Sequence, residues 1–535
     1  MDGRFDILIK HGEIVDGTGR TRYQSDLGVT DGRIAAIASD IPVESASQVM
    51  DAQGLVVSPG FIDTHSHDDF LLIVRPEVQE KVLQGVTTVI IGNCGIGVAP
   101  LTNQHETFIR GMLGGFGGDY LADDYVGISS LGEYFRHVQN AKPSVNVASL
   151  VGHINVRFSV MGLENRDPSP DELQAMKRLV AEAMQDGALG LSTGLAYPPG
   201  GFAKTEEIIE LAREAALFYG IYTSHLRSEA DFIMDALAET ARVGAEAGLP
   251  VHVSHHKLAG RRHWGKSGET LGFMAQTREA GTVMTCDQYP YRAGSTFLSA
   301  LIPPQYLAGG TDALSRSLAD TSVRKEIIQA IEGPPDPAWE NLVDGAGFDN
   351  IIISSSSKHP DYLGMSLAAI AERDCKSAYD AMFDLLADEA MQAGMIMFTM
   401  SEDDVVRIMQ NPFTMVGSDG IPGFGFHRSH PRMTGTFPRV LGRYVREQGV
   451  LSLEEAIRKM TSLPAKTFGL SGKGELREGY DADVVVFDPQ TVRDGSTFDE
   501  PDLAPVGIEW VMVNGYVASE RGNMTGAASG QVIRR

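Results

Sequence analysis

Two histidines stand two residues apart at the end of a short apolar segment. His65 and His67 follow the run Val56–Asp63, which is apolar enough to form a buried strand. Side chains at positions i and i+2 of a strand point to the same side, so both imidazoles can reach one metal ion. A His-x-His pair alone is weak evidence, because such pairs also arise by chance. Its position directly after a strand, and before Asp68 and Asp69, makes it a candidate metal site.

Other metal-capable side chains also follow apolar runs. Cys94 lies between glycines that would let the backbone approach a ligand, although a lone buried cysteine is more often a packing residue. His225 and His255 each end a later run, and the segment between them is long enough to contain one helix. We expect His255 to be the ligand in its segment. Strand alternation turns its neighbours His252 and His256 away, so we expect them to be packing or supporting residues.

Asp419 follows the last apolar run and stands between Ser418 and Gly420. An Asp-Gly pair is also an ordinary turn signal. Asp419 is a catalytic candidate only because the other candidate residues also follow apolar runs. Zinc with three protein ligands and an open position lowers the pKa of bound water to about 7, and the resulting hydroxide can attack an amide carbonyl. A carboxylate then carries the proton to the leaving nitrogen. No G-x-S-x-G pattern surrounds Ser192, which argues against a serine nucleophile.

All these residues would meet at one mouth if the chain formed a (β/α)8 TIM barrel. Short apolar runs alternate with amphipathic helical segments, a pattern that predicts parallel strands connected by helices. The runs are Val56–Asp63, Thr87–Asn93, Val145–Val151, Ala188–Thr193, Gly220–Ser224, Pro250–Ser254, Thr282–Asp287 and Phe413–Ser418. The helical segments between them include Leu173–Gln185, Thr205–Phe218 and Ala230–Ala247.

Both ends of the chain differ from this α/β body, because they consist of alternating strand patterns joined by turns such as Asn514-Gly515. We expect one small β-sandwich domain built from residues 1–55 and 466–535, in preference to two separate caps. The barrel would occupy residues 56–465, with an insertion at about 300–400. The insertion contains the segment Met395–Phe398, whose methionines suit an apolar ligand but more often fill a core.

Composition narrows the class of protein. A net charge of −25 over 535 residues repels phosphate backbones, so nucleic acid is not an expected partner. Three widely spaced cysteines form no disulfide framework, which favours the cytoplasm. No segment approaches the roughly 18 apolar residues of a membrane span, and the first residues lack the apolar stretch of a signal peptide. Nothing in the sequence indicates the oligomeric state.

The constellation resembles the amidohydrolase superfamily, and within it the N-acyl-D-amino acid deacylases, or D-aminoacylases. The resemblance rests on the stretches SPGFIDTHSHDD, GNCGIG, LGLSTGLAYPPG, SHLRSE, VSHHK, DQYPYRAGST, VGSDG and HPRMTGTFPRVLG. GNCG discriminates best, because many relatives bridge two metals with a carboxylated lysine and this branch uses a cysteine. The resemblance implies zinc-dependent hydrolysis of an N-acyl-D-amino acid to a carboxylate and a free D-amino acid.

Carried over motif by motif, the resemblance assigns roles to particular residues. It implies one tight zinc site, formed by Cys94, His225 and His255. It implies a second, weaker metal position at His65, His67 and Asp419, with Asp419 as the catalytic acid and base. Substrate contacts in the family match Lys257, Tyr289 and Ser295, and a lysine with hydroxyls suits a substrate carboxylate. Arg227 and Arg432 are further candidates for this contact, and each could equally be a structural ion-pair partner.

Other functions stay open on the sequence alone. A cyclic amide or ureide hydrolase of the hydantoinase type would usually need a carboxylated lysine, and the fourth run, Ala188–Thr193, offers none. A larger carboxylate-bearing amide is another candidate substrate class, because insertions over a barrel mouth set specificity. A non-catalytic zinc-binding scaffold would leave Asp419 without a role. The preference for a D-configured substrate comes from the family resemblance alone.

Overall fold

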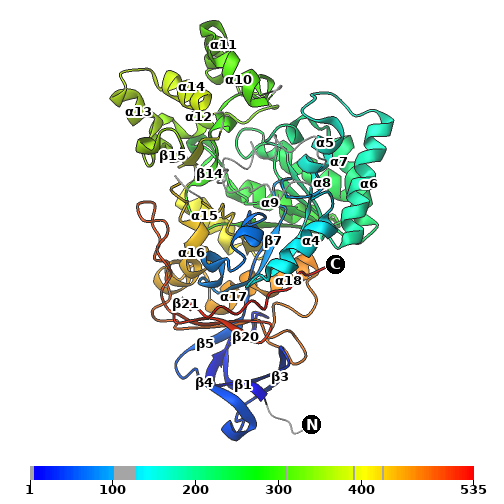
Figure 1. The fold of residues 1–535 in the computed structure, drawn as a ribbon, viewed down its shortest axis with the longest axis vertical. Coiled ribbons are helices and arrows are strands. Elements are labelled where there is room, and N and C mark those ends of the chain that lie inside the picture. The colour runs from blue at the N-terminus through cyan, green and yellow to red at the C-terminus, as the bar shows by residue number, and fades with distance from the viewer. Residues whose placement is uncertain (1–4, 102–127, 308–309, 390–391, 424–426) are drawn as a thin grey trace.

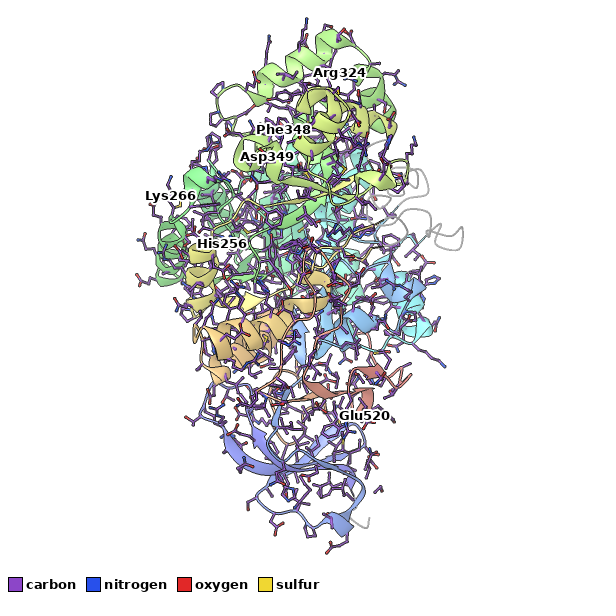
Figure 2. All side chains as sticks on the ribbon, turned by 90° about the vertical axis from the view of Figure 1, so that its left-hand side faces the viewer. His256, Lys266, Arg324, Phe348, Asp349 and Glu520 are labelled. Carbon is purple, nitrogen blue, oxygen red and sulfur yellow. The ribbon has the colours of Figure 1, made fainter. Side chains whose placement is uncertain are left out.

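The computed structural model describes residues 5–101, 128–307, 310–389, 392–423 and 427–535. Three regions are stacked along the long axis: a sheet domain at one end, a barrel in the middle and a mainly helical insertion at the other end (Figure 1). The view turned by 90° shows the same stacking, with Glu520 in the sheet domain, His256 beside the barrel and Phe348 in the insertion (Figure 2).

The middle region is a barrel of parallel strands. The strands are hydrogen-bonded in two runs, β6-β7-β8 and β9-β10-β11-β12-β13-β17. Only Leu150 separates β8 from β9, so these two segments form one of the eight barrel strands. The barrel closes where β17 meets β6, and there the Asp419 N–H donates to the His65 carbonyl at 2.7 Å. The predicted (β/α)8 barrel is therefore confirmed. Its strands are β6 (Phe61–Asp63), β7 (Val86–Ile91), β8 (Asn146–Ser149), β9 (Val151–Gly152), β10 (Gly190–Gly194), β11 (Ile221–His225), β12 (Val251–Val253), β13 (Met284–Gln288) and β17 (Thr414–Val416).

Helices connect the barrel strands. The longest, α6, begins with a capping box, in which Ser169 and Glu172 exchange side-chain and backbone hydrogen bonds, and it ends at Gly187 with φ 108°. The Ser228 hydroxyl accepts from Ala230 and Phe232 N–H, so the third predicted helix begins late, at Ile233. The helices are α1 (Leu71–Val74), α2 (Gln79–Val82), α4 (Leu131–Ala141), α5 (His153–Met161), α6 (Pro170–Asp186), α7 (Thr205–Ala216), α8 (Ile233–Ala247), α9 (Ser267–Glu279), α15 (Glu402–Gln410), α16 (Arg432–Arg439), α17 (Leu453–Met460) and α18 (Ser462–Phe468).

The two ends of the chain meet in one sheet, as expected for a shared β-rich domain. β5 pairs with β1 on one side and with β18 on the other, so the N-terminal and C-terminal strands share a single hydrogen-bonded path. This domain has its own apolar core, which includes Leu27, Val484 and Trp510. Its strands are β1 (Phe5–Ile14), β2 (Tyr23–Thr30), β3 (Arg33–Ala38), β4 (Ala46–Asp51), β5 (Val56–Pro59), β18 (Val484–Phe487), β19 (Ile508–Val513), β20 (Tyr516–Glu520) and β21 (Asn523–Met524).

The run Val56–Asp63, predicted as one barrel strand, is divided between the two regions. β5 belongs to the terminal sheet and only β6 belongs to the barrel. The chain changes sheet at Gly60, where a Cβ atom would lie 2.1 Å from the Thr87 hydroxyl. Both halves of the run are buried, so periodicity does not show the break, although the Pro59-Gly60 pair at this point is a turn signal.

The insertion between β13 and β17 forms a small α/β region with its own core. Its antiparallel sheet contains β14 (Gly294–Phe297), β16 (Gly394–Met397) and β15 (Ile351–Ser355). Met395 is fully buried in this core, whereas Met397 also lines the cavity at the barrel mouth. Its helices are α10 (Gly310–Leu318), α11 (Thr321–Ile331), α12 (Leu342–Ala346), α13 (Leu367–Arg373) and α14 (Ala378–Asp388). In the part of the chain that is described, no helix is long and apolar enough to cross a membrane.

A buried charged cluster closes the barrel between β6 and β17. Lys81 on α2 donates from Nζ to the Asp63 carboxylate and to the Ser418 hydroxyl, both at 2.7 Å. Ser418 in turn donates to Asp63 at 2.6 Å. Lys81 and Asp63 have no exposed side-chain area. The first and last barrel strands are therefore joined by charge-assisted bonds that water does not screen.

We predict that Lys81→Ala lowers the free energy of unfolding by about 3 to 5 kcal/mol, because it leaves the Asp63 carboxylate buried without its cation. Equilibrium urea denaturation followed by circular dichroism measures this loss. Lys177→Ala is the control, because Lys177 pairs with Glu210 and Glu214 where all three side chains are partly exposed. That change should cost less than about 1 kcal/mol. Equal losses in the two variants would contradict the role assigned to the closing cluster.

Candidate metal centre

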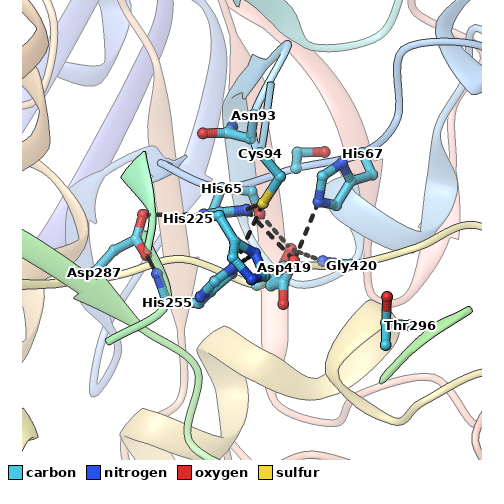
Figure 3. A network of polar contacts seen from close by, with 12 residues as sticks. His65, His67, Asn93, Cys94, His225, His255, Asp287, Thr296, Asp419 and Gly420 are labelled. Atoms are coloured by element: carbon cyan, nitrogen blue, oxygen red, sulfur yellow. Dashed lines mark hydrogen bonds and ion pairs between the residues drawn. The ribbon is translucent and has the colours of Figure 1, made fainter. Parts of the chain in front are cut away.

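Six side chains predicted for the site converge at the mouth of the barrel (Figure 3). Each comes from the carboxyl end of a strand, where catalytic groups of such barrels lie. His65 and His67 follow β6, Cys94 follows β7, His225 ends β11, His255 follows β12 and Asp419 follows β17. The structure thus brings together residues that are separated by up to 354 positions in the chain.

The donor atoms lie close enough to share a cation. Cys94 Sγ is 3.2 Å from His65 Nε2 and 3.4 Å from His255 Nε2. His255 Nε2 is 2.8 Å from His225 Nδ1, and Asp419 Oδ1 is 3.2 Å from His67 Nε2. Imidazole nitrogens, a thiol sulfur and a carboxylate oxygen are the donors that zinc uses in proteins. The residues present therefore fit a zinc site.

Three of these residues have a positive φ angle, which is uncommon outside glycine. The angles are 53° at Cys94, 36° at His255 and 49° at Asp419. Each turns the chain sharply at a strand end. Gly95, beside Cys94, packs against the backbone of β10, because a Cβ there would lie 2.7 Å from Gly194 N. This glycine therefore serves a close approach between chain segments, whereas its sequence position suggested an approach to a ligand.

The charges around the site favour anionic donors. Burial would raise the pKa of the Cys94 thiol, but the charges of His65 and His255 hold it well below its usual value. Burial likewise opposes ionisation of Asp419, yet Arg432, His255 and His65 lower the pKa of this carboxyl well below its ordinary range. A thiolate and a carboxylate are the forms that bind a metal.

Two acidic residues hold the ligand histidines from behind. Asp287 Oδ2 lies 3.5 Å from His65 Nδ1 and 3.0 Å from His252 Nε2. Glu229 Oε1 lies 3.0 Å from His255 Nδ1. A carboxylate on the far ring nitrogen fixes the orientation of a metal-binding histidine. Sequence reasoning assigned neither residue, although Glu229 lies in SHLRSE and Asp287 ends a strand run.

Four of the five predicted substrate-contact residues line the cavity above the metal-capable residues. They are Lys257, Tyr289, Ser295 and Arg432. Lys257 Nζ donates to Glu229 Oε1 at 2.5 Å, and Arg432 Nη1 lies 2.7 Å from Asp419 Oδ2. The Tyr289 ring lies under both cations, 5.8 Å from Lys257 Nζ and 4.7 Å from the Arg432 guanidinium carbon. The cations are therefore held close together on one side of the site.

Arg227 is placed differently. Its guanidinium donates to the carbonyls of Gly201 and Ala203 and pairs with Glu239, outside the lining of the described cavity. Arg227 therefore matches the second of the two roles considered from the sequence, that of a structural ion-pair partner. His256 also turns away from the site, with Nε2 2.9 Å from the Thr270 hydroxyl.

We predict that Asp287→Asn weakens metal binding at the position that includes His65, the weaker of the two expected positions, by about 10- to 100-fold, because the neutral amide holds the His65 ring less firmly. Competition with a chelator measures the affinity. Asp404→Asn is the matched control: Asp404 is also buried and accepts several hydrogen bonds, but from Ser267, Ser401 and Gly265, away from the metal-capable cluster. Unchanged zinc affinity in Asp287→Asn would show that this carboxylate does not support the site.

The sequence matches the model of the amidohydrolase family over residues 48–282 and 362–518. The chain is 40% identical to an N-acyl-D-glutamate deacylase of Alcaligenes xylosoxydans xylosoxydans, over 96% of this chain and 94% of that protein. It is also 40% identical to a D-aminoacylase of the same organism, over 99% of this chain and 98% of that protein.

A solved structure is similar along the whole chain. It is an N-acyl-D-glutamate deacylase from Bordetella bronchiseptica, complexed with zinc and a phosphonate inhibitor that mimics the tetrahedral intermediate of the reaction. The TM-score is 0.83 at 38% identity, covering 99% of this chain and 100% of that chain. On the extent of these matches and the architecture they share, the chain belongs to the amidohydrolase family.

Proposed function

We propose that this protein is a zinc-dependent N-acyl-D-amino acid deacylase, which hydrolyses the amide bond to a carboxylate and a free D-amino acid. The observation that carries the proposal is the convergence of Cys94, His225, His255 and Asp419 in a cavity that also contains Lys257 and Arg432. Relatives with this activity in their names match nearly the full length of the chain. A metal-capable cluster beside two cations suits an amide substrate that bears a carboxylate.

Cys94, His225 and His255 would hold the tight zinc ion. His65, His67 and Asp419 would form a second, weaker position, which the working enzyme can leave empty. A bound zinc ion lowers the pKa of a water ligand and polarises the amide carbonyl. Glu229 and Asp287 would keep His255 and His65 in orientation for binding, since each contacts the ring nitrogen that faces away from the cluster.

Asp419 is the general base and acid of the proposed reaction. Its carboxylate would take a proton from the attacking water as the new C–O bond forms, and return the proton to the amide nitrogen as the C–N bond breaks. Arg432 and His67 hold the two carboxylate oxygens at 2.7 and 3.2 Å, which fixes their direction towards the cavity. The low pKa of Asp419 keeps this group ionised before the reaction begins.

The substrate carboxylate would bind between Lys257 and Arg432. Tyr289 stacks beneath both cations, and its hydroxyl, with that of Ser295, adds hydrogen-bond donors to the same wall of the cavity. A carboxylate anchored there places the adjoining amide near the metal-capable cluster. The anchor would also distinguish linear N-acyl amino acids from neutral amides.

A hydantoinase-type activity is the less favoured alternative. It would usually use a metal-bridging carboxylated lysine, and β10 has the sequence GLSTG. A non-catalytic zinc scaffold is also disfavoured, because Asp419 and the two cations face a cavity beside the cluster. The acidic net charge and the cysteine pattern support a cytoplasmic enzyme that acts on small molecules and binds no nucleic acid.

The decisive experiment is a substrate panel. We predict that the zinc-loaded protein releases amine from N-acetyl-D-amino acids, and that the L-enantiomers react at least about 100-fold more slowly in kcat/KM. The amide derivative of the same D-substrate should react poorly, because it has no carboxylate to bind between Lys257 and Arg432. Turnover of a cyclic ureide with no turnover of any D-substrate would overturn the proposal.

The assigned roles separate in metal analysis. We predict that Cys94→Ala, His225→Ala and His255→Ala each lose the tight zinc and the activity together, because each removes a ligand. Asp419→Ala should keep the tight zinc and lose activity by a factor of at least about 100, since a general acid and base contributes about that much. Zinc content is measured by elemental analysis of the dialysed proteins. A full complement of zinc in Cys94→Ala would show that Cys94 is not a ligand of the tight zinc.

A further inference from the structure

The insertion supplies one wall of the cavity over the metal-capable cluster. Most of this wall is apolar, and with neighbouring segments it presents Ile96, Phe297, Trp339, Leu342, Met397 and Ile421. Trp339 is held in place by a 3.4 Å hydrogen bond from its indole N–H to the Ala300 carbonyl. This wall and the two cations line the same cavity, so the wall is the surface left for the parts of the substrate other than its carboxylate and its amide.

Glu340 is an acidic residue in this apolar wall. Its Oε2 accepts from the backbone N–H of Glu229 at 2.6 Å, which ties the insertion to the loop after β11. Its Oε1 is buried and has no hydrogen-bond partner among the described residues. Burial and the charge of Glu229 raise the pKa of Glu340 to about 8. The surroundings of Glu340 therefore oppose any added negative charge.

The cations of the cavity are already engaged. Lys257 pairs with Glu229, and Arg432 pairs with Asp419. No other lysine or arginine is among the described residues that line the cavity. One substrate carboxylate can bind between these cations. A second carboxylate on the substrate side chain would lie against Glu340 and the apolar wall, where it loses water and gains no counter-charge.

We infer that Glu340 is a specificity-determining residue, which makes this enzyme act on N-acyl-D-amino acids with uncharged side chains and discriminate against N-acyl-D-glutamate and N-acyl-D-aspartate. The inference rests on the proposed deacylase function and names the substrate class within it. It separates this chain from its relative whose name specifies glutamate, despite 40% identity. Specificity here comes from an unfavourable contact with the wrong substrate as much as from a favourable one with the right substrate.

The test compares substrates that differ only in charge. N-Acetyl-D-glutamine and N-acetyl-D-glutamate have nearly the same shape, so the ratio of their kcat/KM values isolates the effect of the second carboxylate. For the zinc-loaded wild type we expect a ratio of at least about 100 in favour of glutamine, as for a buried charge without a partner. N-Acetyl-D-leucine should also exceed the glutamate substrate.

Two variants test Glu340 itself. Glu340→Gln removes the ionisable group and keeps an oxygen that can accept from Glu229 N–H. At about pH 9, where a Glu340 carboxyl with a pKa of about 8 is ionised, we expect this change to lower the glutamine-to-glutamate ratio about tenfold by raising turnover of glutamate. Glu340→Lys adds a counter-charge and should lower the ratio further. The control is Glu326→Gln, an exposed acidic residue on α11 of the same insertion, which should leave the ratio unchanged. Zinc content is measured for every protein.

The outcomes are distinct. A wild type that hydrolyses the glutamate substrate as well as the glutamine substrate overturns the specificity inference and leaves the deacylase function standing. The specificity inference also fails if neither change at position 340 alters the ratio. A zinc-replete wild type that hydrolyses no N-acyl-D-amino acid overturns the proposed function instead.

Discussion

The candidate site depends on the closure of the barrel between β6 and β17. His65 and His67 follow one of these strands and Asp419 follows the other, so the cluster exists only when the two strand ends meet. The meeting is held by the Lys81 ammonium between Asp63 and Ser418, in a place without exposed side-chain area. An ion pair in such surroundings tolerates little change in geometry, because a displaced partner leaves a charge buried alone. The same interaction that completes the fold therefore fixes the spacing of the metal-capable residues.

Much of this arrangement could be predicted from the sequence, because the carboxyl ends of parallel strands share one edge. Once the apolar runs are assigned to barrel strands, Cys94, His225, His255 and Asp419 must face one mouth, whatever their separation in the chain. The apolar period did not reveal the break at Gly60, since both halves of its run are buried, and the turn signal Pro59-Gly60 was the local feature that could have indicated it. The role of Arg227 could not be predicted either, because an arginine that contacts a substrate and one that pairs with a structural carboxylate can have the same local sequence. Glu340 carried no signal, because an acid in an insertion looks like a solvated one until its contacts are known.

The chain combines local strain with buried charge at the mouth of the barrel. Cys94, His255 and Asp419 adopt positive φ angles, which cost of order 1 kcal/mol or more for each residue outside glycine. An ionised thiol and carboxylate lie among imidazoles, and neither state would survive burial without those neighbours. Such features persist only where the surrounding structure determines them, and here the hydrogen-bonded strand ends and the carboxylates of Glu229 and Asp287 do so. A site with these properties is poised to exchange its internal charge contacts for a cation.

The division of labour between barrel and insertion explains how relatives of equal identity can differ in substrate. The cluster, Asp419 and the paired cations come from the barrel, so a change there alters the reaction for every substrate. The wall that contains Trp339 and Glu340 comes from a region with its own sheet and core, where substitutions need not disturb the strand ends. The bond from Glu229 N–H to the Glu340 carboxylate is one of several contacts between the two regions, and it reaches the site because Glu229 also orients His255. Because the bond is made to a main-chain N–H, any side chain with a suitable acceptor can replace Glu340 there, and the charge at this point of the cavity can vary while the metal-capable cluster stays intact.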